Sequence, residues 1–147
     1  MVRLSKAKIR RWARRVLETL GRQKVVLSLV FVNDRQMRKL HRKFLGKNRA
    51  TDVLAFGQNE GKFVSSGRKS LLGDIVLSVE TAKRRAPEFG NRWDRELLLY
   101  LIHGILHLMG FRDSAPTEKI KMRAMEEEIL TKLLGNSWQS KKPKLLF

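Results

Sequence analysis

Two histidines, His103 and His107, are four residues apart in the apolar run "HGILHLMG". On an α-helix, residues at this spacing lie on one face, about 6 Å apart along the axis, so both imidazoles can point at one ion. Neutral imidazole binds zinc and also suits nickel, copper and iron. Because two ligands do not hold an ion firmly, a metal site here requires a third ligand.

Asp113 is the candidate third ligand. Gly110 follows the histidines, where a left-handed residue can end a helix and turn the chain back. The first side chain after that turn that can coordinate an ion is Asp113. A triad of His103, His107 and Asp113 would leave one position open for a metal-bound water. Two alternatives stay open: the histidines can be core residues with satisfied hydrogen bonds, and Asp113 or Ser114 can cap the following helix.

The residue after His103 indicates which reaction such a site would favour. It is Gly104, whereas zinc proteases with an HExxH motif carry a glutamate general base there. Peptide hydrolysis of that type is therefore disfavoured. The remaining possibility is metal-assisted hydrolysis in which the ion activates the water and basic residues stabilise the developing charge. A phosphodiester suits such a site.

The charge balance supports this substrate class. The chain has 32 Lys and Arg against 14 Asp and Glu, a formal net charge of +18. The basic residues alternate with apolar ones, as in "KAKIRRWARRV", so they belong on the faces of a folded protein. An anionic polymer, nucleic acid first, is the expected partner. No apolar run is long enough to span a membrane and no cysteine is present, so we expect a cytoplasmic protein with no membrane contact.

The pattern of apolar residues predicts a mixture of helices and strands. Helical spacing predicts helices over residues 5–20, 34–44, 79–86, 93–109 and 116–134. Apolar runs predict strands over 25–32, 51–56 and 71–79, the first of them buried on both faces. The helix over 93–109 is apolar on all sides and should be the central buried helix. This order favours an α/β or α+β layer of three or four strands.

These motifs resemble a known family, the YbeY-like endoribonucleases, which are bacterial rRNA maturation factors. Their signature HGxLHLxGxDH is matched by "HGILHLMGFRD", and the blocks "TDVLAF", "LLGDIVLS" and "MEEEIL" occur in the family's order, over residues 29–134. The length of 147 residues fits one domain over residues 1–147, with 139–147 a loose tail. The resemblance implies an α+β fold with a metzincin-like metal site on the central helix. It also implies a metal-dependent, single-strand-specific endoribonuclease that matures the 3′ end of small-subunit rRNA and acts in ribosome quality control.

The chain departs from the family at two places. The third zinc-binding histidine of the family falls on Asp113, and the Asp before it falls on Arg112. A carboxylate can still be the third ligand, with weaker binding or an ion harder than zinc. In "HRKFLGKNRAT" the family's functional arginine falls on Leu45. A neighbouring basic residue is then needed to contact the phosphate. We expect this residue to be Arg49, with Arg42 and Lys47 as alternatives. For each of the three, the simpler interpretation is a solvated surface residue without a role in the site.

Several other side chains are further candidates for the site, most of them with a structural alternative. Asp52 and Asp74 can orient a metal-bound histidine from behind, as carboxylates often do, and Asp74 can equally be a structural turn residue. His41 can line the cleft, but we expect it to be exposed. Trp12 and Trp93 can stack on bases, although their apolar neighbours at helical spacing favour the core.

Two hypotheses follow for the function. In the first, His103, His107 and Asp113 hold one divalent ion, zinc in the family, its water attacks a phosphodiester, and the basic face binds ribosomal RNA of the small subunit. In the second, the protein is an RNA- or ribosome-binding assembly factor with weak or no hydrolytic activity. The changes at Leu45 and Asp113 motivate the second hypothesis.

Overall fold

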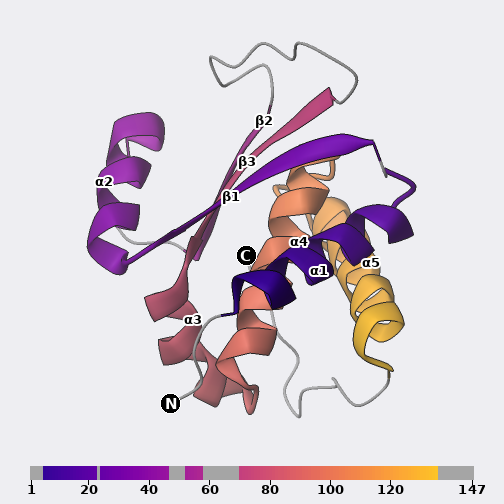
Figure 1. The fold of residues 1–147 in the computed structure, drawn as a ribbon. Helices are drawn as coiled ribbons and strands as arrows, with labels where there is room; N and C mark the ends of the chain where they lie inside the picture. Colours follow the sequence, from indigo (N-terminus) through magenta and orange to yellow (C-terminus); the bar gives the residue numbers. More distant parts are fainter. Residues whose placement is uncertain (1–4, 23, 47–51, 58–69, 136–147) are drawn as a thin grey trace.

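The computed structural model describes residues 5–22, 24–46, 52–57 and 70–135. These residues form an α+β fold, which confirms the predicted fold class (Figure 1). The elements are α1 (Lys6–Thr19), β1 (Val25–Val32), α2 (Asp34–Leu45), β2 (Val53–Gly57), β3 (Ser70–Ser78), α3 (Val79–Arg85), the short 3-10 helix η1 (Ala86–Phe89), α4 (Trp93–Leu108) and α5 (Pro116–Leu134).

The strands form one mixed sheet in the order β1-β3-β2. Strand β1 is parallel to β3, and β2 is antiparallel to β3. Helices α1, α4 and α5 lie on one side of the sheet, and α2 lies on the other (Figure 1). Because α2 and α4 both contact β3, the middle strand is covered on its two faces.

Helix α4 is the centre of the core, as the sequence predicts. It packs against β2, β3, α1, α3 and α5. A cluster of its apolar side chains is fully buried: Leu97, Leu98, Leu101, Ile102, Ile105 and Leu106. At Gly104 the helix approaches the sheet so closely that an added Cβ would lie 3.1 Å from Ile75 and 3.2 Å from Val53. The helix that carries both histidines is therefore held tightly against the sheet.

The prediction that residues 25–32 are buried on both faces is wrong. Val26 and Val30, which point to the same side of β1, are 44% and 43% exposed. The reason is the position of β1 at the edge of the sheet. On this side of the sheet, the cluster that contains Met37 of α2 reaches only the end of β1, at Val32.

The prediction that His41 is exposed is also wrong, because its side chain is only 5% exposed. His41 lies one helical turn after Met37, which is fully buried between α2 and the sheet. The same face of α2 therefore buries both residues.

Among the helices of the described ranges, none is long and apolar enough to cross a membrane.

Candidate metal centre

The two histidines lie in the last turns of α4, with their rings edge to face at an interplanar angle of 80°. The Nε2 atoms of His103 and His107 are 2.9 Å apart. His103 is almost completely buried, whereas the side chain of His107 is 31% exposed. The pair is therefore fixed in the core on one side and accessible to solvent on the other.

The turn after α4 brings the third side chain to this pair. Gly110 has a φ of +98°, in the left-handed region that favours glycine. Its N–H donates to the carbonyl of His107, and the N–H of Phe111 donates to the carbonyl of Leu106, both at 3.0 Å. These two hydrogen bonds form a Schellman motif, which ends the helix and reverses the chain.

The reversed chain places Asp113 against both histidines. Its Oδ2 atom is 3.3 Å from the Nε2 atoms of His103 and of His107. The cap of α5 is Ala115, whose N–H donates to the carboxylate of Glu118 at 2.8 Å, so Asp113 is not the helix cap. The structure thus brings together the three residues that the sequence singles out.

The three donor atoms are arranged as a metal ion requires. Donors at about 2.0–2.2 Å from a tetrahedral ion are about 3.3 Å from one another. The two histidine nitrogens and the Asp113 oxygen, at 2.9 to 3.3 Å from one another, fit this arrangement. His103, His107 and Asp113 could therefore hold one metal ion.

Glu126 on α5 is a residue of the site that the sequence reasoning misses. Its Oε1 atom is 3.3 Å from Nδ1 of His103, and the residue is 7% exposed. A proton on Nδ1, donated to this carboxylate, leaves the Nε2 lone pair facing His107 and Asp113. The sequence does contain a sign that Glu126 is buried, because it has the same helical spacing as the apolar residues Met122 and Ile129.

The environment of His107 favours the neutral imidazole that a metal ion requires. Burial lowers the pKa of His107 below its usual value, and the neighbouring His103 lowers it further. The Asp113 carboxylate opposes both effects. Because a ligating histidine must be unprotonated, the lowered pKa favours metal binding at neutral pH.

The other candidate residues have different roles or lie elsewhere. Asp52 is buried and pairs with Arg85 at 3.2 Å. Asp74 is half-buried in β3, where it is opposite Ser28 of β1 and Phe56 of β2. The carboxylate that lies at Nδ1 of His103 is that of Glu126.

The structure describes some of the basic and aromatic candidates but not all of them. Arg42 is exposed on α2, whereas Lys47 and Arg49 lie outside the described residues. Trp12 is buried in the core and Trp93 packs against it, as predicted.

The fold is α+β, with a three-stranded mixed sheet packed against a central helix. Two histidines and an aspartate meet at the end of that helix and form a three-donor site that could hold a metal ion. The chain belongs to the YbeY family, because the family model described as Endoribonuclease YbeY matches residues 2–134.

Curated relatives of the same name agree with this assignment. Endoribonuclease YbeY of Pelotomaculum thermopropionicum is 39% identical over 125 residues, which cover 84% of this chain and 82% of that protein. The Aquifex aeolicus protein is 36% identical over 132 residues, with coverages of 89% and 85%. The Myxococcus xanthus protein is 42% identical over 119 residues, and there the match spans 81% of this chain but only 40% of the relative.

A solved structure is similar over nearly the whole chain. It is the solution structure of TM1509 from Thermotoga maritima, with a TM-score of 0.58 and 26% sequence identity. The similarity covers 97% of this chain and 95% of that one.

Proposed function

We propose that this protein is a metal-dependent, single-strand-specific endoribonuclease that acts in the maturation of small-subunit rRNA and in ribosome quality control, in the cytoplasm. Membership of the YbeY family supports an endoribonuclease role in rRNA processing. The observation that carries the metal dependence is the convergence of His103, His107 and Asp113 at distances that fit a bound ion. We expect the ion to be zinc.

The residues of the site have distinct tasks in this proposal. His103, His107 and Asp113 hold the ion, and Glu126 keeps the ring of His103 in the ligating tautomer. A divalent ion in such a site lowers the pKa of a coordinated water and polarises a phosphoryl oxygen. Gly104 is turned toward Ile75 and Val53, so the position after His103 offers no general base, which is consistent with a phosphodiester substrate rather than a peptide.

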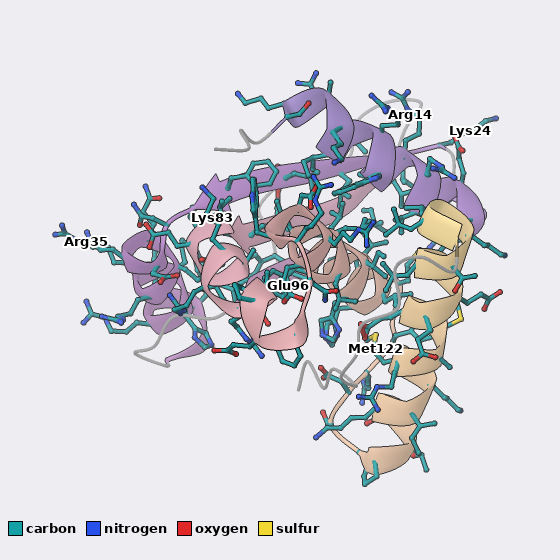
Figure 2. All side chains as sticks on the ribbon, turned by 90° about the horizontal axis from the view of Figure 1, so that it is seen from below. Arg14, Lys24, Arg35, Lys83, Glu96 and Met122 are labelled. Carbon is teal, nitrogen blue, oxygen red and sulfur yellow. The ribbon has the colours of Figure 1, made fainter. Side chains whose placement is uncertain are left out.

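The basic face of α1 supplies the RNA-binding surface. It consists of exposed cations at helical spacing: Lys6, Arg10, Arg11 and Arg14. Arg14 extends outward from α1, and Lys24 extends outward just before β1 begins (Figure 2). The apolar side of α1, with Trp12 and Val16, is buried in the core. Because that side is not available to enter a lipid bilayer, the cations favour a polyanion such as RNA.

The test is the metal content of purified wild type and Asp113→Ala, with cleavage of a single-stranded RNA measured on the same preparations. Ser114→Ala is the matched control, since Ser114 is the exposed neighbour of Asp113. We expect one equivalent of metal in the wild type and in Ser114→Ala. Asp113→Ala should lose both metal and cleavage.

Two other outcomes would contradict the proposal. Full metal content and cleavage in Asp113→Ala would remove Asp113 from the site. A wild type that binds RNA but neither binds nor responds to added zinc, magnesium or manganese would instead support the assembly-factor hypothesis.

A further inference from the structure

A pocket opens beside the turn that carries Asp113. Its volume is about 290 Å³, and it lies between the end of α4 and the first turns of α5. The lining residues are Met109, Gly110, Phe111, Arg112, Glu118 and Lys121. Gly110 is the left-handed residue of the Schellman motif, so the pocket and the metal centre share one turn of the chain.

The pocket combines an apolar wall with cations. Met109 and Phe111 are half-buried and pack against the main core, so this wall is fixed in place. Arg112 and Lys121 are exposed. A third cation borders the wall, because Nε of Arg22 donates to Sδ of Met109 at 3.4 Å.

The acidic member of the lining does not cancel this charge. The carboxylate of Glu118 accepts the N–H of Ala115 at 2.8 Å and so stabilises the first turn of α5. The positive end of the α5 dipole lies at the same place. Three cations and a helix N-terminus against one engaged carboxylate leave the pocket electropositive.

An apolar wall beside cations matches the chemistry of a nucleotide. A base or sugar can pack on Met109 and Phe111, while a guanidinium and an ammonium contact the phosphate. At about 290 Å³ the pocket is at the lower end of the range for small-ligand sites. It therefore accommodates one nucleotide better than a segment of an acidic protein.

The position of the pocket relates it to the proposed reaction. Arg112 directly precedes Asp113, whose carboxylate faces the two histidines. An RNA strand with one phosphate at the metal centre therefore has a neighbouring nucleotide within reach of this pocket. We infer that Arg112 and Lys121 bind the phosphate of a nucleotide adjacent to the scissile one. This inference rests on the proposed endoribonuclease function.

The test compares two double variants with equal loss of charge. Arg112→Gln/Lys121→Gln removes the two cations of the pocket. Arg35→Gln/Lys119→Gln is the control: both residues are exposed, neither lines the pocket, and Figure 2 shows Arg35 extending from α2 on the far side of the molecule from α5. The measurements are metal content and the Kd of a fluorescent single-stranded RNA oligonucleotide at several salt concentrations.

We expect the pocket variant to keep its metal and to bind the oligonucleotide at least about tenfold more weakly, since each lost contact is a charge-assisted hydrogen bond. Its slope of log K against log salt should be smaller by about 0.7, the value for the one phosphate that the two cations contact. The control should change much less in both respects.

Two results would overturn the inference. Equal weakening of both double variants would mean that only the overall charge acts. If an acidic peptide such as polyglutamate bound the wild type as tightly as RNA and lost affinity in the pocket variant alone, the site would serve a protein partner. An absence of cleavage by the wild type would refute the proposed catalytic function, but it would leave the binding comparison interpretable.

Discussion

The contact between His103 and Glu126 leads to a prediction about metal affinity. A buried carboxylate behind a ligating histidine fixes the ring and raises its basicity, and its loss typically weakens metal binding by about 10–100-fold. We therefore expect Glu126→Gln to bind zinc about 10–100-fold more weakly than the wild type, as measured by competition with a chelator. Glu126→Ala should be weaker still, because the glutamine oxygen can accept the Nδ1 proton.

Glu127 provides the matched control for this prediction. It is the next residue on α5 and is exposed, so Glu127→Gln should leave zinc affinity unchanged. Equal affinities of the two glutamine variants would show that Glu126 does not act through His103. A urea unfolding curve for each variant separates this effect from a general loss of stability.

The residues of the site differ in how far the sequence predicts them. The histidine pair and Asp113 follow from local rules, namely the helical i, i+4 spacing and the turn after a glycine. Glu126 is 23 residues from His103 along the chain, and its contact depends on how α5 packs against α4. His41 shows the same limit, because its burial depends on which face of α2 meets the sheet.

The packing of β3 against β2 and α4 depends on Gly73. Its φ is +156°, and an added Cβ would lie 2.8 Å from Cδ2 of Leu108 and in direct overlap with the carbonyl oxygen of Phe56. Leu108 follows His107, so relief of the overlap would move the end of α4. We expect Gly73→Ala to lower the free energy of unfolding by at least about 2 kcal/mol in urea titrations, since the overlap involves backbone as well as a packed side chain.

Gly57 is the control for this change. It is opposite Gly73 in the sheet, and a Cβ there would meet no atom of the described residues within 4 Å. Gly57→Ala should therefore alter the free energy of unfolding by much less. If both variants lost a similar amount of unfolding free energy, the close contacts at Gly73 would not be the cause of the destabilisation.

Asp34 joins the start of α2 to the start of α3. Its Oδ1 accepts hydrogen bonds from the hydroxyls of Ser78 and Thr81 at 2.9 and 2.8 Å, and its Oδ2 pairs with Arg84. Burial raises the pKa of Asp34, but the hydrogen bonds from Arg84, Thr81 and Ser78 outweigh this effect and hold the pKa below its usual value.

The lowered pKa of Asp34 gives a pH-dependent prediction. A group whose pKa is lower in the folded state stabilises the fold above its unfolded pKa, which is about 3.9 for Asp, and loses this contribution as the pH falls through the folded value. Asp34→Asn should therefore be less stable than the wild type at pH 7, and the difference should shrink below about pH 4. Urea unfolding at several pH values measures it; a difference that stays constant to pH 3 would contradict the assignment.

The order of the strands in the sheet was not predictable from the pattern of apolar residues. The apolar run at residues 25–32 predicts a strand correctly, but its pairing with residues 70–78 joins segments far apart in the sequence. Burial on both faces is typical of a central parallel strand. Because β1 is instead at the edge of the sheet, Val26 and Val30 remain exposed.

The net charge of +18 should have opposite effects on RNA binding and on folding. Binding of RNA releases counterions from the phosphates, so added salt should weaken it, with log K falling linearly against log salt by about 0.7 for each phosphate contacted. The free protein is subject to repulsion among its own cations, which salt screens. We therefore expect the melting temperature without RNA to stay constant or rise over the same salt range.

The RNA affinity and the melting temperature can be measured on one preparation, by fluorescence anisotropy of a labelled single-stranded RNA and by thermal unfolding. Neutralisation of Arg10 and Arg14 on α1 should flatten the salt dependence of binding, because these exposed cations belong to the proposed RNA-binding face. An RNA affinity that does not change with salt would show that apolar contacts, rather than phosphates, hold the RNA. A melting temperature that falls with salt would show that attractive ion pairs, such as Lys8 with Asp94 at 2.8 Å, outweigh the repulsion across the surface.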